Sequence, residues 1–505
     1  MPESRDSLLA DCQQLMATGK WNEARSRLEN AFAAAPTDVL IAYTLATACR
    51  LSGMADRAAR LFQAIHTALP DMAEAAIGLA HSLAELDGSD RATEVLRRYV
   101  VQRPEQTVPY ATLAEIWLKS GTFTPVIRNF RAAAILAPTA DTIGNLAESL
   151  SLERCFEQAE QQYRLALAKA PGSAKLKLNY AIHLLSQGNT SEGWKYFEAR
   201  LAPAIADAPV RTLSLPRWSG NAVADKHILV VSEQGLGDEI RLAALLPELA
   251  GKARALTVEC DPRLISLFER SMPGVTFHAF SRIKKSGRGH YTYGWLPHDG
   301  GPDCYIELGS LPLMLNHGLT APGDMGGFLS PSGRLRDEIG ERLRVAAQGR
   351  QLVGLSWASS ARQFGRSTNY PPAESWRRLL DLPDTCLVSL QYGEAANAVK
   401  ELEEATGRKI FQLRDLDLRH DLEALAALEA SLDLVLSVGN ATAALSGAVG
   451  TKTLELLSSP GWVPLLNDRD SFLGATHRMA QRRLGDWTYP VEKARELALT
   501  RLRKQ

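Results

Sequence analysis

The sequence predicts an α plus α/β fold class, in which an array of helical repeats precedes two α/β domains. Over about the first 200 residues, small and apolar residues recur at intervals of about 34, as expected for stacked pairs of helices. From residue 227 onward, short apolar runs alternate with helical patterns in two successive sets, which predicts two parallel sheets. A length of 505 residues suits about three domains.

Several columns of equivalent residues share the repeat register. The prolines that end the units are separated by 34, 34, 34 and 33 residues, and they are Pro36, Pro70, Pro104, Pro138 and Pro171. Proline ends a helix because it lacks a donor and clashes with the preceding turn. Mostly small residues, which let paired helices approach closely, stand twelve positions before each proline: Ala24, Ala58, Ala92, Val126 and Ala159. A sixth unit fits at the same internal spacing, with Ala181, Gly193 and Phe197.

This period resembles the tetratricopeptide repeat over about residues 5–200. We expect an α-solenoid of about six units in residues 1–202. The concave surface of such arrays usually binds protein segments, and we favour this interpretation over an array that only supports or dimerises the rest of the chain. Residues 203–226 are rich in Pro and Ala and are expected to form a linker.

Two Rossmann-like halves are expected to follow the linker and to face a cleft. The first is expected over residues 227–335, where the apolar run Ile228–Ser232 precedes a glycine-containing turn and a helical stretch. The order restarts near Leu352, so the second half is expected over residues 336–505, including a closing helix. Sheets of this kind bind ligands at the carboxyl ends of their strands, so the loops there are candidate sites.

The first candidate loop consists of Glu233, Gln234, Gly235, Leu236, Gly237 and Asp238. Its glycines permit a tight turn and the close approach of a ligand to the backbone. The helix that follows offers free N–H groups to an anion. Asp238 would lie near the start of that helix, either as a cap or as a functional carboxylate.

Loops of the second half carry side chains that could bind a phosphate, a ribose or a base. The alternative is that they are ordinary polar loops that bind no ligand. Hydroxyl groups and an arginine could hold a phosphate, and the helix after Gly439 offers N–H groups to an anion. A glutamine beside an aromatic ring could contact a base or ribose. These candidate residues are Trp357, Ser359, Ser360, Arg366, Gln391, Glu394, Asn440 and Thr442.

Composition argues against several classes of protein. The 57 basic and 57 acidic residues balance, which disfavours nucleic-acid binding unless a local patch exists. No apolar run is long enough for a membrane span, and the first residues do not resemble a signal peptide. Six scattered cysteines suit a reducing compartment, so we expect a cytoplasmic protein. Motifs of metallohydrolases, esterases and P-loop NTPases are absent, and neither a metal nor a cofactor is expected.

A series of segments over residues 192–488 resembles bacterial proteins in which tetratricopeptide repeats precede a GT-B glycosyltransferase domain. These segments are EGWKYFEARL, PRWSG, EQGLGDEIRLA, VGLSWASS, VSLQYGE, DLVLSV, SGAVG and GDW. The α/β part is similar to heptosyltransferases, and the domain order is similar to that of protein O-GlcNAc transferases. Relatives in this group modify flagellin in the cytoplasm with nonulosonic (sialic-acid-like) sugars.

The resemblance implies a role for each candidate loop. Asp238 matches the aspartate that takes the proton of the acceptor hydroxyl, and the second half would bind a nucleotide sugar without a metal. The acceptor would be a protein held by the repeats, with flagellin as one example. In one place the chain departs from the family, which has Asp-Thr and a histidine four residues after that threonine. Here the stretch reads Gly439-Asn440-Ala441-Thr442-Ala443-Ala444.

Two other functions stay open. The altered loop favours a repeat scaffold whose α/β part is a catalytically degenerate remnant. The heptosyltransferase likeness also allows an enzyme that acts on a glycan, although a glycan acceptor would not need a peptide groove.

Overall fold

The computed structural model describes residues 4–120, 125–233, 235–285, 288–297, 300–315, 327–358, 369–392, 395–459, 461–466, 469–470 and 472–502. The chain divides into two compact units. We call residues up to Gly172 the repeat unit, and residues from Ser173 onward the α/β unit. Among the described residues, none of the helices combines the length and the apolar character that crossing a bilayer requires.

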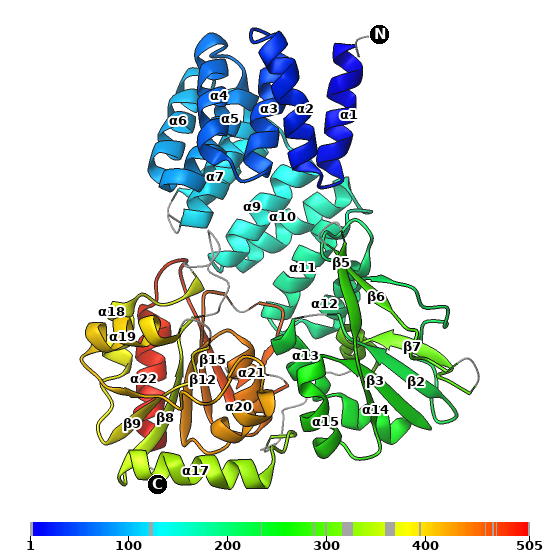
Figure 1. The fold of residues 1–505 in the computed structure, drawn as a ribbon, viewed down its shortest axis with the longest axis vertical. Coiled ribbons are helices and arrows are strands. Elements are labelled where there is room, and N and C mark those ends of the chain that lie inside the picture. The colour runs from blue at the N-terminus through cyan, green and yellow to red at the C-terminus, as the bar shows by residue number, and fades with distance from the viewer. Residues whose placement is uncertain are drawn as a thin grey trace. The chain divides into compact units, whose positions relative to one another are not determined.

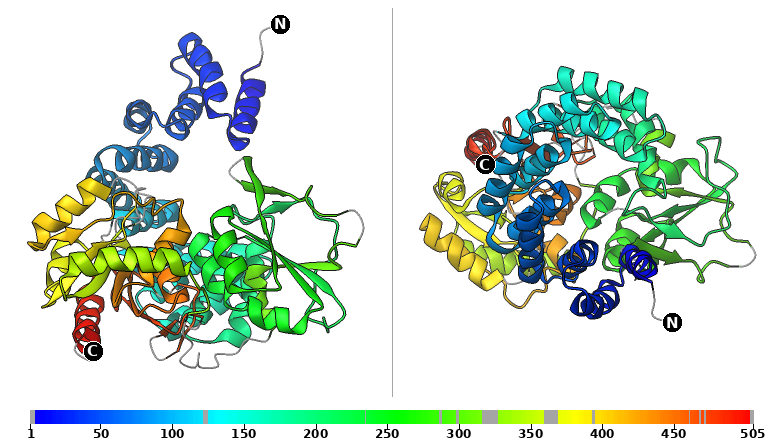
Figure 2. Two further views of the ribbon diagram at one scale, coloured as in Figure 1. Left: turned by 60° about the horizontal axis from the view of Figure 1, so that its bottom comes forward. Right: turned by 90° about the horizontal axis from the view of Figure 1, so that it is seen from above.

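The repeat unit consists of helices that each pack against the next along the chain (Figure 1). Figure 2 shows the same helices from two further directions. They are α1 (Arg5–Ala17), α2 (Trp21–Ala34), α3 (Val39–Leu51), α4 (Ala55–Ala68), α5 (Ala73–Asp87), α6 (Ser89–Gln102), α7 (Thr107–Ser120), α8 (Val126–Leu136), α9 (Ala140–Leu152) and α10 (Phe156–Lys169).

The repeat columns explain where these helices end and how they pack. Each of the helices α2, α4, α6, α8 and α10 ends two residues before one of the repeat prolines. Ala24, Ala58 and Ala92 are fully buried, as small residues at close helix crossings should be. Gly53 has a φ of +81°, a conformation that a side chain would strain, and it turns the chain from α3 into α4. The predicted helical-repeat array is therefore confirmed.

The sixth helix pair, α11 (Ala174–Ser186) and α12 (Thr190–Phe197), belongs to the α/β unit. Its Trp194 and Phe197 are each 4% exposed. Their ring centroids lie 6.0 and 5.7 Å from that of Trp462, far away in the sequence. The last repeat is thus part of the hydrophobic core of the α/β unit.

The first sheet of the α/β unit has four parallel strands in the order β4-β3-β2-β7. The strands are β2 (His227–Val231), β3 (Ala255–Cys260), β4 (Thr276–Ala279) and β7 (Cys304–Glu307). Its helices and 3-10 turns are η1 (Glu198–Leu201), α13 (Leu236–Ala243), α14 (Leu246–Lys252), η2 (Pro262–Leu264), α15 (Ile265–Ser271), η3 (Leu308–Ser310) and α16 (Leu311–Met314).

The segment expected as a linker contains ordered structure. Strand β1 (Val210–Arg211) pairs with β6 (Arg288–Thr292), which also pairs with β5 (Ser281–Lys285). Trp218 is 4% exposed and belongs to the main core of the α/β unit. Strand β1 and the buried Trp218 therefore attach parts of residues 203–226 to the α/β unit, although the composition of the segment is typical of a linker.

The second sheet has eight strands in the order β10-β9-β8-β11-β12-β15-β14-β13. The first six are parallel, and β14 and β13 complete the edge in antiparallel pairs. They are β8 (Gln351–Ser356), β9 (Thr385–Ser389), β10 (Ile410–Phe411), β11 (Leu434–Val438), β12 (Thr453–Leu457), β13 (Leu465–Leu466), β14 (Arg469–Asp470) and β15 (Thr476–Ala480). The predicted class, a helical array followed by Rossmann-like parallel sheets, is confirmed.

Helices surround this second sheet, and apolar side chains from them form its core. They are α17 (Gly333–Ala347), α18 (Ala373–Leu379), α19 (Ala395–Thr406), α20 (Leu422–Glu429), α21 (Ala441–Ala448) and α22 (Thr488–Leu502). Trp376 of α18 and Ala494 of α22 share one core cluster with Val353 of β8. Helix α22 follows the last strand of this sheet along the chain.

Truncation tests whether the sixth repeat belongs to the α/β core. A fragment of residues 173–505 should unfold at the temperature of the α/β unit in the whole chain. A fragment of residues 203–505 lacks Trp194 and Phe197, so it should melt roughly 10 °C lower or more. It should also bind more of a dye that reports exposed apolar surface. Equal melting temperatures for the two fragments, measured by circular dichroism, would contradict this assignment.

Candidate functional site

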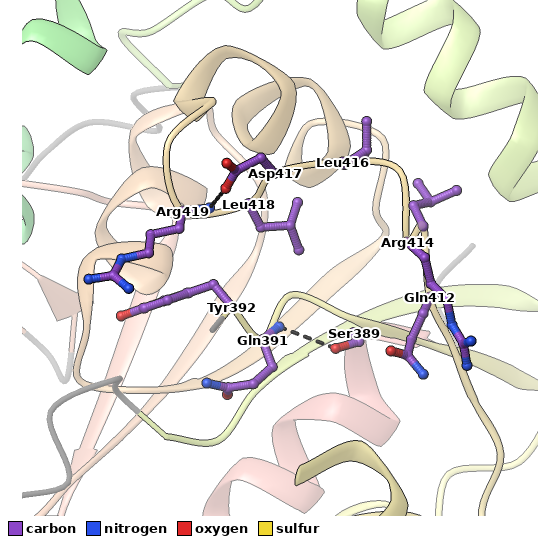
Figure 3. A pocket seen from close by; sticks show the side chains of 10 residues that line it. Ser389, Gln391, Tyr392, Gln412, Arg414, Leu416, Asp417, Leu418 and Arg419 are labelled. Atoms are coloured by element: carbon purple, nitrogen blue, oxygen red, sulfur yellow. Dashed lines mark hydrogen bonds between the residues drawn. The ribbon is translucent and has the colours of Figure 1, made fainter. Parts of the chain in front are cut away.

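A cavity of about 300 Å³ lies beyond the carboxyl ends of β9 and β10. Tyr392 and Arg419 lie on one side of it, and Gln412 and Arg414 lie on the other (Figure 3). The cavity adjoins the first half, because Arg263 of η2 donates a hydrogen bond to the Arg419 carbonyl oxygen at 2.9 Å. It therefore has the position expected for a ligand site in a parallel sheet, at the strand ends.

Gln391 joins the loops that follow β8 and β9. Its Oε1 accepts hydrogen bonds from the backbone N–H groups of Trp357 and Ala358, each at 3.2 Å. Its Nε2 donates to the Ala358 carbonyl oxygen at 2.9 Å. The structure thus brings together Trp357 and Gln391, two of the residues that the sequence nominates. Gln391 is 6% exposed, so its amide mainly shapes the rim of the cavity.

Asn440 caps helix α21 and also bonds to two strands. Its Oδ1 accepts from the Ala443 N–H at 3.0 Å and from the Ser437 hydroxyl at 3.2 Å. Its Nδ2 donates to the Ser356 hydroxyl oxygen at 2.8 Å. Thr442 is 1% exposed, and within the described part of the chain its hydroxyl has no hydrogen-bond partner. The hydrogen bonds of the Asn440 side chain thus stabilise the fold itself, whether or not a ligand binds nearby.

Asp238 lies in the first turn of α13 and faces the second half. Gly235 is the N-cap residue of this helix, so Asp238 stands at its third position. Burial raises the pKa of the Asp238 carboxyl, while the Arg241 guanidinium and a hydrogen bond from the Trp462 side chain oppose the rise. Trp462 belongs to the second half, so this carboxylate lies where the two halves meet.

The first turns of α13 and α21 are in direct contact. A Cβ atom on Gly237 would lie 3.3 Å from the Cα atom of Ala441 and 3.5 Å from its nitrogen. Glycine at position 237 therefore permits the close approach of the two helices. The structure brings together two loops that the sequence nominated separately, 233–238 and 439–444.

A buried ion cluster joins the halves one turn further along α13. Arg241 donates to a carboxylate oxygen of Glu455 at 2.7 Å and to one of Asp470 at 2.9 Å. Arg478 donates to the second oxygen of Glu455 at 2.8 Å. These side chains are at most 6% exposed. The cluster was not predicted, because its members come from one helix and three strands that are distant in the sequence.

Glu233 forms a buried ion pair with Arg200. The Arg200 guanidinium donates to Glu233 Oε1 at 2.6 Å, and the Gly309 N–H donates to the same oxygen at 2.8 Å. Arg200 is 5% exposed at the end of the sixth repeat. The Glu233 carboxylate therefore links that repeat to the first sheet.

A second group of buried carboxyl side chains lies at the ends of β2 and β3. Glu239 accepts hydrogen bonds from the Ser232 hydroxyl and from the Asp261 N–H, each at 2.8 Å. Glu259 accepts from the Tyr293 hydroxyl at 3.2 Å and from Arg211 at 3.3 Å. Burial raises the pKa of each glutamate to about 7. The sequence offered one clue to this group, because Glu259 stands between apolar residues at the end of strand β3.

Five nominated residues lie outside the described residues: Gln234, Ser359, Ser360, Arg366 and Glu394. Among the residues that the structure describes, no group of three or more His, Cys, Asp or Glu side chains has the arrangement of a metal site.

The fold places this protein among proteins in which a tetratricopeptide-type array precedes a Rossmann-like α/β unit. The cavity of that unit lies at the strand ends. At the level of sequence, the chain is 30% identical to protein FlbA of Caulobacter vibrioides over 455 residues, which cover 89% of this chain and 76% of FlbA. The chain therefore belongs to the FlbA family. No family model matches it.

Comparison with solved structures gives partial likenesses. A glycosyl transferase of family 9 from Veillonella parvula is 15% identical, with a TM-score of 0.40, and the match covers 56% of this chain and 100% of that one. A tetratricopeptide-repeat protein from Thermus thermophilus is 22% identical, with a TM-score of 0.32, and the match covers 36% of this chain and 100% of that one.

The raised pKa of Glu239 predicts a pH dependence of stability. The folded value of about 7 exceeds the ordinary value of 4.5, so between these values the folded chain holds a proton that the unfolded chain has lost. This stabilising contribution is present below pH 4.5 and is lost as the pH rises to about 7. Glu239→Gln keeps an acceptor for Asp261 and a partner for Ser232. The variant should therefore lose less stability between pH 5 and pH 8, by a difference on the order of 3 kcal/mol.

Urea unfolding at both pH values measures this difference. The matched control is Glu248→Gln, which alters a surface glutamate paired with Lys252 and should keep the wild-type profile. Glu259 should leave some pH dependence in the Glu239 variant. Parallel profiles for the wild type and Glu239→Gln would show that Glu239 is ionised in the folded chain.

The Arg241 cluster predicts a large loss of stability when its central charge is removed. Arg241→Met leaves Asp470 buried without its guanidinium partner, which should cost about 3–5 kcal/mol of unfolding free energy. The control Arg342→Met breaks an exposed pair with Asp415 and should cost about 1 kcal/mol or less. Urea denaturation measures both values. Similar small losses would mean that the cluster does not hold the halves together.

Proposed function

We propose that this chain is a GT-B glycosyltransferase that moves a sugar from a nucleotide donor onto a Ser or Thr hydroxyl of a protein held by the repeats. The sequence resemblance favours flagellin as the acceptor, a nonulosonic acid as the sugar and the cytoplasm as the compartment. The observation that carries this proposal is Asp238. Its carboxylate comes from the first half and faces the second, where the strand-end loops and their cavity lie.

Asp238 has the chemistry that a general base requires. In the proposed reaction, the acceptor oxygen forms a bond to the anomeric carbon of the sugar and gives its proton to Asp238. The bond from that carbon to the donor phosphate oxygen breaks, and its electron pair leaves with the nucleotide. Burial raises the pKa of Asp238, which increases its proton affinity relative to an exposed aspartate.

The cavity near β9 and β10 is the proposed nucleotide site. Tyr392 offers a ring for stacking against a base, and Gln412 offers an amide for hydrogen bonding. Arg414 and Arg419 supply positive charge for the phosphates, so the proposed reaction does not require a metal.

A second candidate function is a repeat scaffold without transferase activity. It is favoured by the contact between Gly237 and Ala441, because α13 lies against the helix start that was expected to hold a phosphate. The Asn440 side chain, whose amide forms hydrogen bonds within the fold, also favours it. Binding of a nucleotide sugar distinguishes the two functions.

Asp238→Asn tests the proposed base. The amide still accepts a hydrogen bond from Trp462 but cannot take a proton, so turnover should fall by about 10²-fold or more. Donor affinity by calorimetry, with a panel of UDP, GDP, ADP and CMP sugars, should stay close to that of the wild type. The control Asp225→Asn alters an exposed aspartate shortly before the first half begins and should keep full turnover.

Each outcome has a separate meaning. Unchanged turnover in Asp238→Asn would reject Asp238 as the base. Failure of the wild type to bind any donor in the panel would favour the scaffold. Transfer to a free glycan, without transfer to protein, would instead support the heptosyltransferase-like function.

A further inference from the structure

A groove of about 620 Å³ lies within the repeat unit, between α6, α7 and α8. This volume is within the range of roughly 300–1,000 Å³ that is typical of ligand-binding clefts. The second helices of two neighbouring pairs, α6 and α8, contribute to its lining together with the intervening α7. From α7 come Tyr110, Leu113 and Trp117, whose spacing of three and four residues places them on one helix face.

The groove continues into exposed apolar surface. Val101 lines it and is 80% exposed. Ile135 occupies the equivalent position one repeat later and is 73% exposed. Exposure of large apolar side chains in register on neighbouring repeats is typical of a surface that another molecule covers.

Positive charge surrounds the apolar part of the groove. Three arginines and one glutamate line it, which leaves a local excess of two positive charges. Arg98 pairs with Glu94 at 2.6 Å, whereas Arg97 is 4.0 Å from the same carboxylate. Arg128 is exposed and forms no hydrogen bond or ion pair with the residues that the structure describes. One carboxylate, Glu94, is thus shared by Arg97 and Arg98 and neutralises only one of them, so Arg128 and the weakly paired Arg97 remain available to an anionic partner.

We propose that this groove binds a segment of a partner protein in which carboxylates flank a bulky apolar side chain. The inference builds on the part of the proposed function in which the repeats recruit a protein. The apolar side chain would lie against Tyr110 and Trp117, and the carboxylates would bond to Arg97 and Arg128. Arginine forms strong paired hydrogen bonds with carboxylates, and buried aromatic residues supply much of the energy of protein interfaces.

The charge and shape of the groove favour an acidic peptide over other anions. A nucleic acid presents a long line of phosphates and requires an extended basic surface, whereas the lining of this groove offers an excess of only two positive charges beside an aromatic face. A peptide can supply separated carboxylates together with an apolar anchor. The required pattern is acidic, apolar and acidic within a short segment.

Selection from a random twelve-residue peptide library tests this proposal with the full-length chain. The wild type should enrich peptides in which Asp or Glu flank Leu, Phe or Trp. The double variant Arg97→Glu/Arg128→Glu reverses the two available charges and should lose this enrichment. The matched control Arg60→Glu changes an arginine of α4 that is 71% exposed and does not line the groove, and it should select as the wild type does.

Fluorescence anisotropy with a labelled enriched peptide then gives the size of the effect. The double variant should bind at least about tenfold more weakly. Affinity should fall as NaCl rises from about 50 to about 300 mM, because exposed charge pairs are screened. Trp117→Ala should weaken binding and Trp117→Phe should retain most of it, with thermal unfolding showing that both variants are folded.

Several results would overturn the groove as an acidic-peptide site. In the selection, these results are no enrichment of any peptide or enrichment of basic peptides. In the binding measurements, they are an affinity of the double variant equal to that of the wild type, or tighter binding of phosphatidylglycerol vesicles or single-stranded RNA that depends on the groove. Peptide binding without any sugar transfer would leave the groove supported and the transferase function rejected. Conversely, unchanged transfer to the protein acceptor by the double variant would reject the groove while supporting the transferase.

Discussion

The buried ion cluster around Arg241 is the interaction on which the geometry of the α/β unit depends. Arg241 extends from the first half and is bonded to Glu455 and Asp470 of the second, with all three almost fully buried. Burying charges costs several kcal/mol for each ion unless opposite charges and hydrogen bonds replace the lost water, and that requirement favours one relative position of the halves. Asp238 precedes Arg241 by one helical turn on α13, so the position that suits the cluster also directs Asp238 toward Trp462.

The same arrangement affects where the proposed nucleotide-sugar donor could bind. The first turn of α13 lies against that of α21, and a Cβ atom at Gly237 would come within 3.3 Å of the Ala441 Cα atom, so little space remains between the two helices. At residues 439–444 the chain departs from the pattern of the glycosyltransferases that its sequence resembles. This departure lies at the contact between the two helices, where Asn440 is hydrogen-bonded to Ser356 and Ser437. One cavity at this sheet edge lies near Tyr392 and Arg419. In the proposed reaction, the phosphates of the donor would therefore depend on arginine side chains such as Arg419 more than on the N–H groups of α21.

The sequence predicts structure well where a pattern is local and less well where partners are distant. Ala58 and Pro70 follow a strict period, so the helix pairs and their ends could be predicted from spacing alone. The sixth pair keeps that period, but its Trp194 packs on Trp462 across more than 250 residues, which no local pattern encodes. The edge strands β13 and β14 have two residues each and leave almost no signal. At the site, the position of Gln391 directly after a predicted strand was enough to place it in a candidate loop. The Arg241 cluster could not be predicted in this way, because its side chains meet only in the folded chain.

Overall charge gave a similarly incomplete view of the repeats. The equal numbers of acidic and basic residues correctly describe the whole chain, but a partner experiences the charges within about 10 Å of it at 0.1 M salt. Arg97 and Arg128 line a groove whose lining carboxylate, Glu94, lies 2.6 Å from Arg98 and 4.0 Å from Arg97. Among the residues that line the groove, positive charges therefore exceed negative charges by two, although the whole chain is balanced. A neutral chain can in this way attract a short acidic segment without attracting polyanions in general, because a polyanion would also meet the carboxylates elsewhere on the surface.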